Sequence, residues 1–417
     1  MPRFWRACTE MKILFLSDNF PPEGNAPATR LWEHATRWVA AGHEVTVITC
    51  APNFPEGRVY PGYRNAWRSV ETMSGIRVVR VKTYITSNEG FVKRTLDYMS
   101  FMLMAVAVGL FERRPEVLIA TSPQFFCACA GWALSGLRRV PFVFELRDLW
   151  PASIVAVGAM RKSFVIRVLE CVEMFLYRRA DRIVAVTETF KTELIRRGVA
   201  ADKIRVVLNG VDLTLYQPRE KSSELIREFG LESALVAGYI GTHGMAHALD
   251  KVVDAAGRLQ HRHDIKFLFV GGGAERAHVE KLVSDRGLNN VILVSRQPKE
   301  RMPEIWGLCD VAIVPLRNTP VFATVIPSKI FECMGMGLPI LMSLPRGEAT
   351  SIVESTGAGV CVPPEDSAAM AAAIEHLADC PEERQTLAKA GERAAQLYSR
   401  DASAKRMLDA LSELKAR

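Results

Sequence analysis

Residues 321–340 read VFATVIPSKIFECMGMGLPI, a stretch that combines a loop, a short helix and the start of a strand. Pro327 blocks an earlier start of the helix and Ser328 can cap it, so the helix is predicted to begin at one of these residues. The glycines that follow end the helix, and an extended chain resumes at 339–341. The first turn of such a helix offers unpaired N–H groups and a partial positive charge, which suit phosphate.

Lys329 and Glu332 lie three residues apart in this helix and therefore share one face. The lysine adds a formal positive charge to a phosphate site, and the glutamate can hold a sugar hydroxyl. An ordinary connection between a strand and a helix, with both side chains in solvent, gives the same pattern. These residues by themselves leave both interpretations open.

Short apolar runs alternate with amphipathic segments along the rest of the chain. Strands are predicted at 12–17, 44–49, 76–81, 117–121, 142–146, 182–186, 204–208, 235–240, 266–270, 291–294, 311–315 and 359–362. Alternating strands and helices predict parallel, doubly wound sheets. Residues 51–75, rich in proline, glycine and arginine, are predicted to form a long loop.

The fold class expected is α/β, with two facing Rossmann-like domains. A polar connector at 213–233 divides the chain into a first domain, residues 11–215, and a second domain, residues 216–395. The helices predicted after residue 381 are long enough for about 396–417 to cross back to the first domain. Ligands of such sheets bind at the carboxyl ends of the strands, so the cleft between the domains is the expected site.

Composition limits the class of protein. The chain has 417 residues, 49% of them hydrophobic, and its nine cysteines lack zinc or iron–sulfur spacing, which indicates reduced thiols, a cytosolic compartment and no structural metal. Residues 1–219 hold 30 basic and 20 acidic side chains, whereas the remainder holds 23 and 26. The basic half suits phosphate-rich ligands or an anionic membrane surface, and the absence of a nucleic-acid-binding motif argues against nucleic acid.

Two segments bear on targeting. Residues 1–10 carry two arginines and no long apolar run, so they are expected to be an extension rather than a signal peptide. The longest apolar run, residues 99–111, has thirteen residues, fewer than the roughly eighteen of a membrane-spanning helix. It is predicted to be a buried helix or one that lies against a membrane.

In the first domain, polar residues follow two predicted strands. Gly24 and Asn25 form a small-residue loop before a helix, where the backbone can approach a phosphate or sugar, and Arg30 can reach the same ligand. A simple turn with a surface arginine is the alternative.

The second group of polar residues in this domain closes the strand at 142–146. Glu145 and Arg147 share one strand face and can pair, while Asp148 can accept a proton or hold a hydroxyl. A structural ion pair is the alternative, and Trp150 with Pro151 is expected to serve packing.

In the second domain, Thr242 and His243 follow the first strand, before the next helix begins. His243 is better placed than His247 to touch a ligand, although lone histidines are more often structural. The glycines at 271–273 allow a tight turn beside a nucleotide but do not form a nicotinamide-binding motif. Arg296 can contact a nucleobase edge.

Eight motifs, in order along nearly the whole chain, resemble the family 4 (group 1) retaining glycosyltransferases of the GT-B fold. They are Met11-Lys-Ile-Leu with the Pro-Pro-Glu-Gly loop, Gly42-His-Glu-Val-Thr-Val, Val186-Thr-Glu, Asn209-Gly-Val-Asp, Gly238-Tyr-Ile-Gly, Val270-Gly-Gly-Gly, Pro327-Ser-Lys-Ile-Phe-Glu and Gly337-Leu-Pro-Ile. The last two, which lie in the opening stretch, are the most specific. Residues 52–57 and 147–151 resemble the subgroup that builds O-antigen and capsule repeats, including N-acetyl-fucosamine transferases.

The resemblance implies a UDP- or GDP-sugar donor, with a UDP-sugar expected, bound mainly by the second domain without a metal. Its diphosphate would meet Lys329, Ser328 and the backbone of Val325 and Ile326. The family has two glutamates eight positions apart; here the second is Glu332 and Thr324 stands at the first. Thr242 and His243 replace a family arginine, and Arg147 with Asp148 replaces a family histidine.

The resemblance assigns catalytic roles to Asp148, Arg147, Lys329 and Glu332, and places Glu145, Glu188 and Arg30 on the acceptor side. It implies retention through front-face attack, with the leaving phosphate helping to deprotonate the acceptor. A polyprenyl-diphosphate-linked saccharide is the expected acceptor, at the cytoplasmic face of the inner membrane, where the protein would dock through basic groups such as 161–162 and 196–197. A UDP-sugar 2-epimerase and a non-catalytic sugar-nucleotide-binding scaffold are the alternatives.

Overall fold

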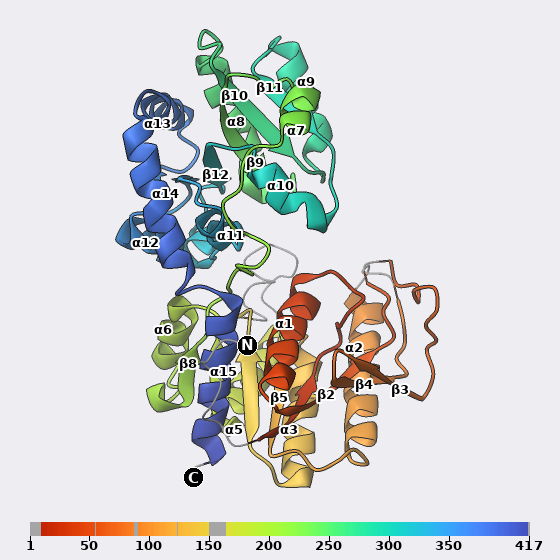
Figure 1. The fold of residues 1–417 in the computed structure, drawn as a ribbon. Helices are drawn as coiled ribbons and strands as arrows, with labels where there is room; N and C mark the ends of the chain where they lie inside the picture. Colours follow the sequence, from red (N-terminus) through yellow and green to blue (C-terminus); the bar gives the residue numbers. More distant parts are fainter. Residues whose placement is uncertain (1–9, 55, 87–90, 123, 150–163, 416–417) are drawn as a thin grey trace. The chain divides into compact units, whose positions relative to one another are not determined.

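The structure is a computed structural model that describes residues 10–54, 56–86, 91–122, 124–149 and 164–415 (Figure 1). It divides into two compact units: the first runs to Asn209 and resumes at Ser403, and the second spans Gly210–Ala402. The first unit is therefore built from two separate parts of the chain. Residues 150–151 and 161–162 lie outside the described residues.

Among the described residues, the first unit contains an eight-stranded sheet with the order β3-β4-β2-β1-β5-β6-β7-β8. The strands are β1 (Lys12–Leu16), β2 (Glu44–Cys50), β3 (Arg68–Met73), β4 (Ile76–Val81), β5 (Val117–Thr121), β6 (Phe142–Leu146), β7 (Arg182–Ala185) and β8 (Ile204–Val206). All pairs are parallel except β3 with β4. The prediction of a loop over 51–75 was wrong in part, because β3 is a largely exposed edge strand without an apolar run.

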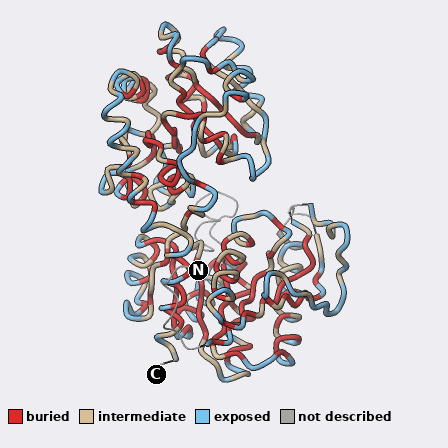
Figure 2. Tube along the Cα trace, in the orientation of Figure 1, coloured by how far each residue is buried: buried red, intermediate tan, exposed pale blue. Residues whose placement is uncertain are grey.

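Helices cover both faces of this sheet. In the described part of the unit, one face carries α1 (Ala26–Ala40) and α15 (Arg400–Lys415). The other face carries α2 (Phe91–Gly109), α3 (Phe125–Arg138), α5 (Phe164–Arg179) and α6 (Glu188–Arg196). The sheet thus has a core on each side, and in Figure 2 its strands are the most continuously buried part of the unit. The predicted return of the C-terminal helix to the first domain is confirmed.

The second unit contains, among the described residues, a six-stranded parallel sheet with the order β11-β10-β9-β12-β13-β14. The strands are β9 (Leu235–Ile240), β10 (Ile265–Val270), β11 (Val291–Val294), β12 (Val311–Pro315), β13 (Ile340–Ser343) and β14 (Gly359–Val362). The longer helices are α7 (Ser223–Phe229), α8 (Leu249–Arg258), α9 (Arg276–Asp285), α10 (Met302–Trp306), α11 (Lys329–Gly335), α12 (Glu348–Thr356), α13 (Ser367–Asp379) and α14 (Pro381–Ala395). Each unit is a doubly wound α/β domain, as predicted.

The structure adds detail to two segments that the sequence analysis described only broadly. The connector at 213–233 contains α7, which Ser222 caps by accepting a hydrogen bond from the N–H of Leu225. The helical stretch predicted after residue 381 consists of two helices, α14 and α15. Short amphipathic segments give a weak signal in the first case, and in the second no proline or glycine marks the break.

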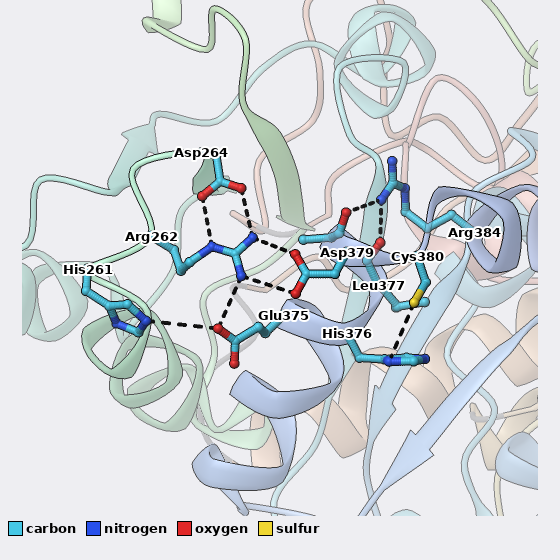
Figure 3. A network of polar contacts seen from close by, with 10 residues as sticks. His261, Arg262, Asp264, Glu375, His376, Leu377, Asp379, Cys380 and Arg384 are labelled. Atoms are coloured by element: carbon cyan, nitrogen blue, oxygen red, sulfur yellow. Dashed lines mark hydrogen bonds and ion pairs between the residues drawn. The ribbon is translucent and has the colours of Figure 1, made fainter.

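An ion-pair network joins two elements of the second unit (Figure 3). The guanidinium of Arg262, which lies just before β10, contacts Asp264 at 2.9 Å and reaches Asp379 at 2.8 Å and Glu375 at 3.2 Å on α13. These acids hold the pKa of Arg262 above its usual range. The network fastens α13 to the edge of the sheet at which the strands begin, which is not where the ligand loops of a parallel sheet lie.

Candidate functional site

Two glycine loops at the carboxyl ends of β9 and β10 are packed backbone to backbone. The N–H of His243 donates to the carbonyl of Gly272 at 2.9 Å, and the N–H of Glu275 donates to the carbonyl of His243 at 2.9 Å. A Cβ on Gly271 would lie 1.9 Å from the carbonyl oxygen of Gly241, and φ is +148° at Gly271. Only glycine fits there. The two loops therefore pack closely together at the carboxyl ends of the strands, which we call the ligand edge of the sheet.

Lys329 brings a positive charge to this surface. Its Nζ lies 4.0 Å from the ring centroid of Tyr239, and a Cβ on Gly241 would be 3.0 Å from the same atom. Within the described chain, no carboxylate forms an ion pair with Lys329. Burial therefore lowers its pKa to about 8, against weaker opposing effects of Cys333 and Glu332.

His243 is buried beneath the same loops. Its ring lies 5.8 Å from that of Tyr239 and 6.3 Å from that of Phe269, between centroids. Burial, together with the charges of Arg276 and Lys329, lowers its pKa to about 4, so the imidazole is neutral at neutral pH. Neither ring nitrogen has a hydrogen-bond partner among the described residues. The sequence placed this histidine correctly on the loop but could not show its burial.

Helix α11 presents the remaining residues of the opening stretch. It begins at Lys329, and Ser328 is exposed and makes no side-chain capping bond, so the predicted cap is wrong. The backbone of Ser328 is already helical, with φ −59° and ψ −28°, and its hydroxyl is therefore not in the capping position. One turn on, Glu332 is half-buried; burial raises its pKa, and Lys329 and the Trp306 indole oppose this effect.

The loop before α11 holds Thr324 at the end of a 3-10 turn, Pro320–Thr324. The Thr324 hydroxyl donates to the carbonyl of Val321 at 2.8 Å. Val325 is exposed and Ile326 is half-buried. Elsewhere on the ligand edge, Thr242 and Arg296 are exposed, and a Cβ on Gly272 would lie 3.9 Å from the Cβ of Arg296. The glycine loops therefore bring Arg296 beside the site.

In the first unit, Arg30 and Glu145 form a buried ion pair, with Nε and Oε1 2.9 Å apart. The guanidinium also donates to the carbonyls of Val207 and Leu208 and to the side chain of Asn209. The predicted pairing of Glu145 with Arg147 is therefore replaced by a pairing with Arg30. Spacing along one strand could not reveal that α1 supplies the partner from the same side of the sheet.

Charge is concentrated around this pair. Burial alone would raise the pKa of Glu145, but Arg30 and Arg147 outweigh it and lower that pKa to about 2. Burial lowers the pKa of Arg147 to about 10. The N–H groups of Arg147 and Asp148 both point to the hydroxyl of Ser122, at 2.7 and 3.3 Å. Ser122 thus fixes the turn that carries these two predicted catalytic residues.

The other predicted residues of the first unit lie at loops of the same sheet edge. Asn25 caps α1 by accepting a hydrogen bond from the N–H of Ala28 at 3.0 Å, and its amide donates to Asn19. A Cβ on Gly24 would meet open space. Glu188, in the first turn of α6, is exposed and lies 3.4 Å from Lys191. The Asn25 side chain is therefore occupied in holding its own loop.

Two acids were missed by sequence reasoning. Asp18 lies two residues beyond the end of β1, and burial raises its pKa to about 6. Asp97 lies on α2; burial, followed by the charge of Asp18, raises its pKa to about 7. The usable signals were an aspartate at a strand end and a lone carboxylate within an apolar helix. Both acids add titratable groups to the ligand edge of the first sheet.

No described helix is both long enough and apolar enough to span a lipid bilayer. Comparisons with known proteins cover nearly the whole chain. A family model described as a glycosyl transferase 4-like domain matches residues 25–210, and one described as glycosyl transferases group 1 matches residues 222–394. WcaI of Escherichia coli K12, a glycosyl transferase assigned to colanic acid biosynthesis, is 27% identical over 375 residues, which are 87% of this chain and 91% of WcaI.

Solved structures agree on the fold. Sucrose-phosphate synthase from Thermosynechococcus elongatus superposes with a TM-score of 0.75 at 20% identity, covering 98% of this chain and 100% of that one. HepE of Anabaena, crystallised with UDP and glucose, superposes with a TM-score of 0.68 at 20% identity, covering 97% and 100%. The two matched models together span both units, and the chain belongs to the group 1 (family 4) glycosyltransferases of the GT-B fold.

Proposed function

We propose that this glycosyltransferase moves a sugar from a UDP-sugar to a polyprenyl-diphosphate-linked saccharide, with retention, during synthesis of a cell-surface polysaccharide. The observation that carries the proposal is the ammonium of Lys329, which lies over Tyr239 and against the glycine loops without an ion pair among the described residues. A partly buried cation without a counter-ion is unfavourable, and a bound diphosphate would supply that counter-ion.

The leaving group of such a reaction is a nucleoside diphosphate, and its developing charge needs fixed donors and a cation more than a strong base. Lys329 would supply the cation. The N–H groups of Val325, Ile326 and Ser328, and those of the glycine loops, would supply donors that need no reorganisation. The UDP and glucose named in the HepE crystal structure support a UDP-sugar as the donor. The proposed chemistry assigns no role to a metal and needs no covalent nucleophile.

Glu332 and Thr324 would then face the sugar of the donor. Glu332, one turn beyond Lys329, would accept hydrogen bonds from donor hydroxyls. Thr324 occupies the position of the family's first glutamate, and its hydroxyl already donates to Val321, which leaves its oxygen as an acceptor. His243, buried beneath the glycine loops, would support their shape rather than touch the sugar. We propose an N-acetylated or deoxy amino sugar, in keeping with the subgroup that residues 52–57 resemble.

The acceptor would bind at the ligand edge of the first sheet. Arg147 carries a positive charge beside the Arg30–Glu145 pair, which suits an acceptor that bears a diphosphate. Asp148 would hold the acceptor hydroxyl, while the leaving phosphate takes its proton. The assignments of WcaI to colanic acid and of TuaH of Bacillus subtilis to teichuronic acid biosynthesis support a polysaccharide pathway. The enzyme would work at the cytoplasmic face of the membrane.

A donor screen tests the proposal. The full chain is incubated with UDP- and GDP-sugars and a polyprenyl-diphosphate monosaccharide, and products are identified by mass spectrometry and their anomers by NMR. The expected result is a disaccharide product from a UDP-sugar that keeps the anomeric configuration of the donor. Conversion of the donor without an acceptor would indicate the epimerase instead. Tight UDP-sugar binding without hydrolysis or transfer would indicate a scaffold. The Lys329→Met variant serves as the inactive reference.

A further inference from the structure

Three helices on one face of the first sheet are apolar on their outer sides as well as their inner sides. The helices are α2, α3 and α5, and α3 packs against both of the others (Figure 1). Their inner residues fill the core on that face of the sheet. On α2, an exposed outer stripe follows at helical spacing, formed by Leu96, Met99 and Leu103, and the exposed Leu110 comes directly after the helix. A helix on a protein surface normally has a single apolar face, which is turned towards the core, and its other side is polar.

The outer stripes of α3 and α5 meet each other. Trp132 of α3 contacts Phe175 of α5 edge to face, with ring centroids 4.9 Å apart. Along α5, Val168, Cys171 and Phe175 line a shallow hollow of about 340 Å³. Leu137 at the end of α3 and Phe111 just beyond α2 are 62% and 89% exposed. We call the outer sides of α2, α3 and α5, with Phe111, the apolar face. Exposed apolar side chains that gather on one side of a protein mark an interaction site.

Arginines without an ion pair among the described residues border the apolar face where its helices end. Each helix is followed or closed by two of them: Arg113 and Arg114, Arg138 and Arg139, Arg178 and Arg179. Arg138 donates to backbone carbonyls, and Arg179 lies 5.4 Å from the Phe175 ring centroid. Among the described residues, none of these six forms an ion pair with a carboxylate. By contrast, Arg196 and Arg197, which the sequence suggested as membrane contacts, are paired with Glu193.

We propose that the apolar face docks on an anionic lipid bilayer. Guanidinium groups hydrogen-bond to lipid phosphates, and the apolar side chains enter the boundary between head groups and acyl chains. Favourable contact with the helix dipoles accounts for arginines at helix ends, but it does not account for the apolar stripes beside them. The exposed acid on these helices, Glu170, is outnumbered by the arginines.

A bilayer fits this surface better than a second copy of the chain does. A two-fold pair formed through the apolar face would bring two arginine-rich borders together, and like charges would oppose it. A bilayer supplies both the apolar phase and the phosphates. The biological use of this surface rests on the proposed function, since a lipid-diphosphate acceptor resides in a membrane. The docking itself rests only on the surface of the first unit.

Vesicle binding by the full chain tests the proposal. Cosedimentation is measured with vesicles of phosphatidylglycerol and phosphatidylethanolamine, and with vesicles of phosphatidylcholine alone. We expect binding to the anionic vesicles that weakens at high salt, and about tenfold weaker binding to phosphatidylcholine. The double variant Leu103→Glu, Leu137→Glu should bind about tenfold more weakly. Leu397→Glu is the matched control, because Leu397 is 59% exposed, close to the 63% of Leu103, and lies outside the apolar face.

A second pair of variants tests the charges. Arg178→Glu with Arg179→Glu should weaken binding to anionic vesicles, whereas Lys405→Glu with Arg406→Glu makes the same charge change on α15, on the other face of the sheet, and should leave binding unchanged. Absence of wild-type binding to anionic vesicles, or equal losses in test and control variants, would overturn the proposal. So would a concentration-dependent dimer that Leu103→Glu dissociates while vesicle binding persists.

The same variants separate this proposal from the proposed function. Far-ultraviolet circular dichroism establishes that each variant is folded. Transfer from the UDP-sugar to a detergent-solubilised acceptor should be unchanged in the variants of the apolar face, because none of their residues belongs to the ligand loops. If the wild type docks on vesicles but transfers no sugar, the proposed function fails alone. If transfer occurs in detergent but vesicles do not bind, the docking proposal fails alone.

Discussion

At the scale of single residues, Lys329 is the residue on which the proposed donor site chiefly depends. It was identifiable from the sequence as a cation in the first turn of a helix. Its distinguishing property, a pKa lowered to about 8, comes from burial against Tyr239 and the glycine loops, which no local pattern encodes. The partner of Glu145 shows the same limit, because Arg30 is far away in sequence and only folding brings the two side chains together.

Replacing Lys329 with methionine should weaken UDP binding. The loss of a charge-assisted contact to the diphosphate is expected to cost about 2 kcal/mol, roughly thirtyfold in Kd, with the unfolding temperature nearly unchanged. Isothermal titration calorimetry measures the affinity. Lys281→Met, at an exposed position on α9, is the control and should bind UDP as the wild type does. Wild-type affinity in Lys329→Met would contradict the donor site.

The lowered pKa of Lys329 predicts that UDP affinity depends on pH. Only the ammonium form attracts the diphosphate, and with a free-state pKa of about 8 that form becomes scarce above pH 8. Bound diphosphate raises the pKa, so binding should take up a proton, and affinity should fall by up to about tenfold per pH unit above 8. Calorimetry at pH 8.5 in two buffers of different ionisation enthalpy measures the uptake. Lys329→Arg should abolish it, because arginine stays charged.

At the scale of elements, most strands could be predicted from the sequence, because buried parallel strands consist of continuous runs of apolar residues. It failed where elements lack such runs. The edge strand β3 is largely exposed, and α7 is short and polar. The glycine loops were predicted only in part. Their glycines can be read in the sequence, but the close contact between Gly271 and the backbone of Gly241 forms only in the folded protein.

Two neighbouring glycines provide a matched test of that contact. Gly271→Ala should destabilise the second unit by about 2 kcal/mol or more and weaken UDP binding, because its Cβ would overlap the carbonyl of Gly241. Gly272→Ala should change stability by no more than about 0.5 kcal/mol, since the Cβ would have its nearest neighbour at 3.9 Å. Urea denaturation measures both. Equal effects of the two substitutions would show that the loops are not packed as described.

At the scale of the whole molecule, the first unit depends on both ends of the chain. The Trp38 indole donates to the carbonyl of Ala404 at 3.0 Å, and the Ser403 hydroxyl donates to the carbonyl of Leu208 at 3.1 Å. Glu413 accepts from Arg182 and Arg205, each at 2.6 Å. Helix α15 is therefore part of the first unit, although the second unit separates the two segments along the chain.

A core substitution in α15 should act on the first unit. Leu408 is fully buried there, and Leu408→Ala should cost about 2–5 kcal/mol. If the units unfold separately, the transition that UDP does not shift should move to lower temperature, while the UDP-stabilised transition stays in place. Differential scanning calorimetry with and without UDP distinguishes them. Leu397→Ala, at an exposed leucine, is the control. A shift confined to the UDP-stabilised transition would contradict the assignment of α15.

The sequence alone determined the α/β class and the two Rossmann-like domains, and it singled out the stretch 321–340 as the centre of the proposed donor site. Periodicity and glycine spacing are local properties, and they act within a few residues. Only the tertiary structure decided which charges are paired, which histidine is buried, and which apolar residues remain exposed after the core is complete. Apolar residues on the inner and outer sides of α2 look alike in the sequence. What separates Phe101 in the core from Leu103 on the surface is the position of the sheet and of α3.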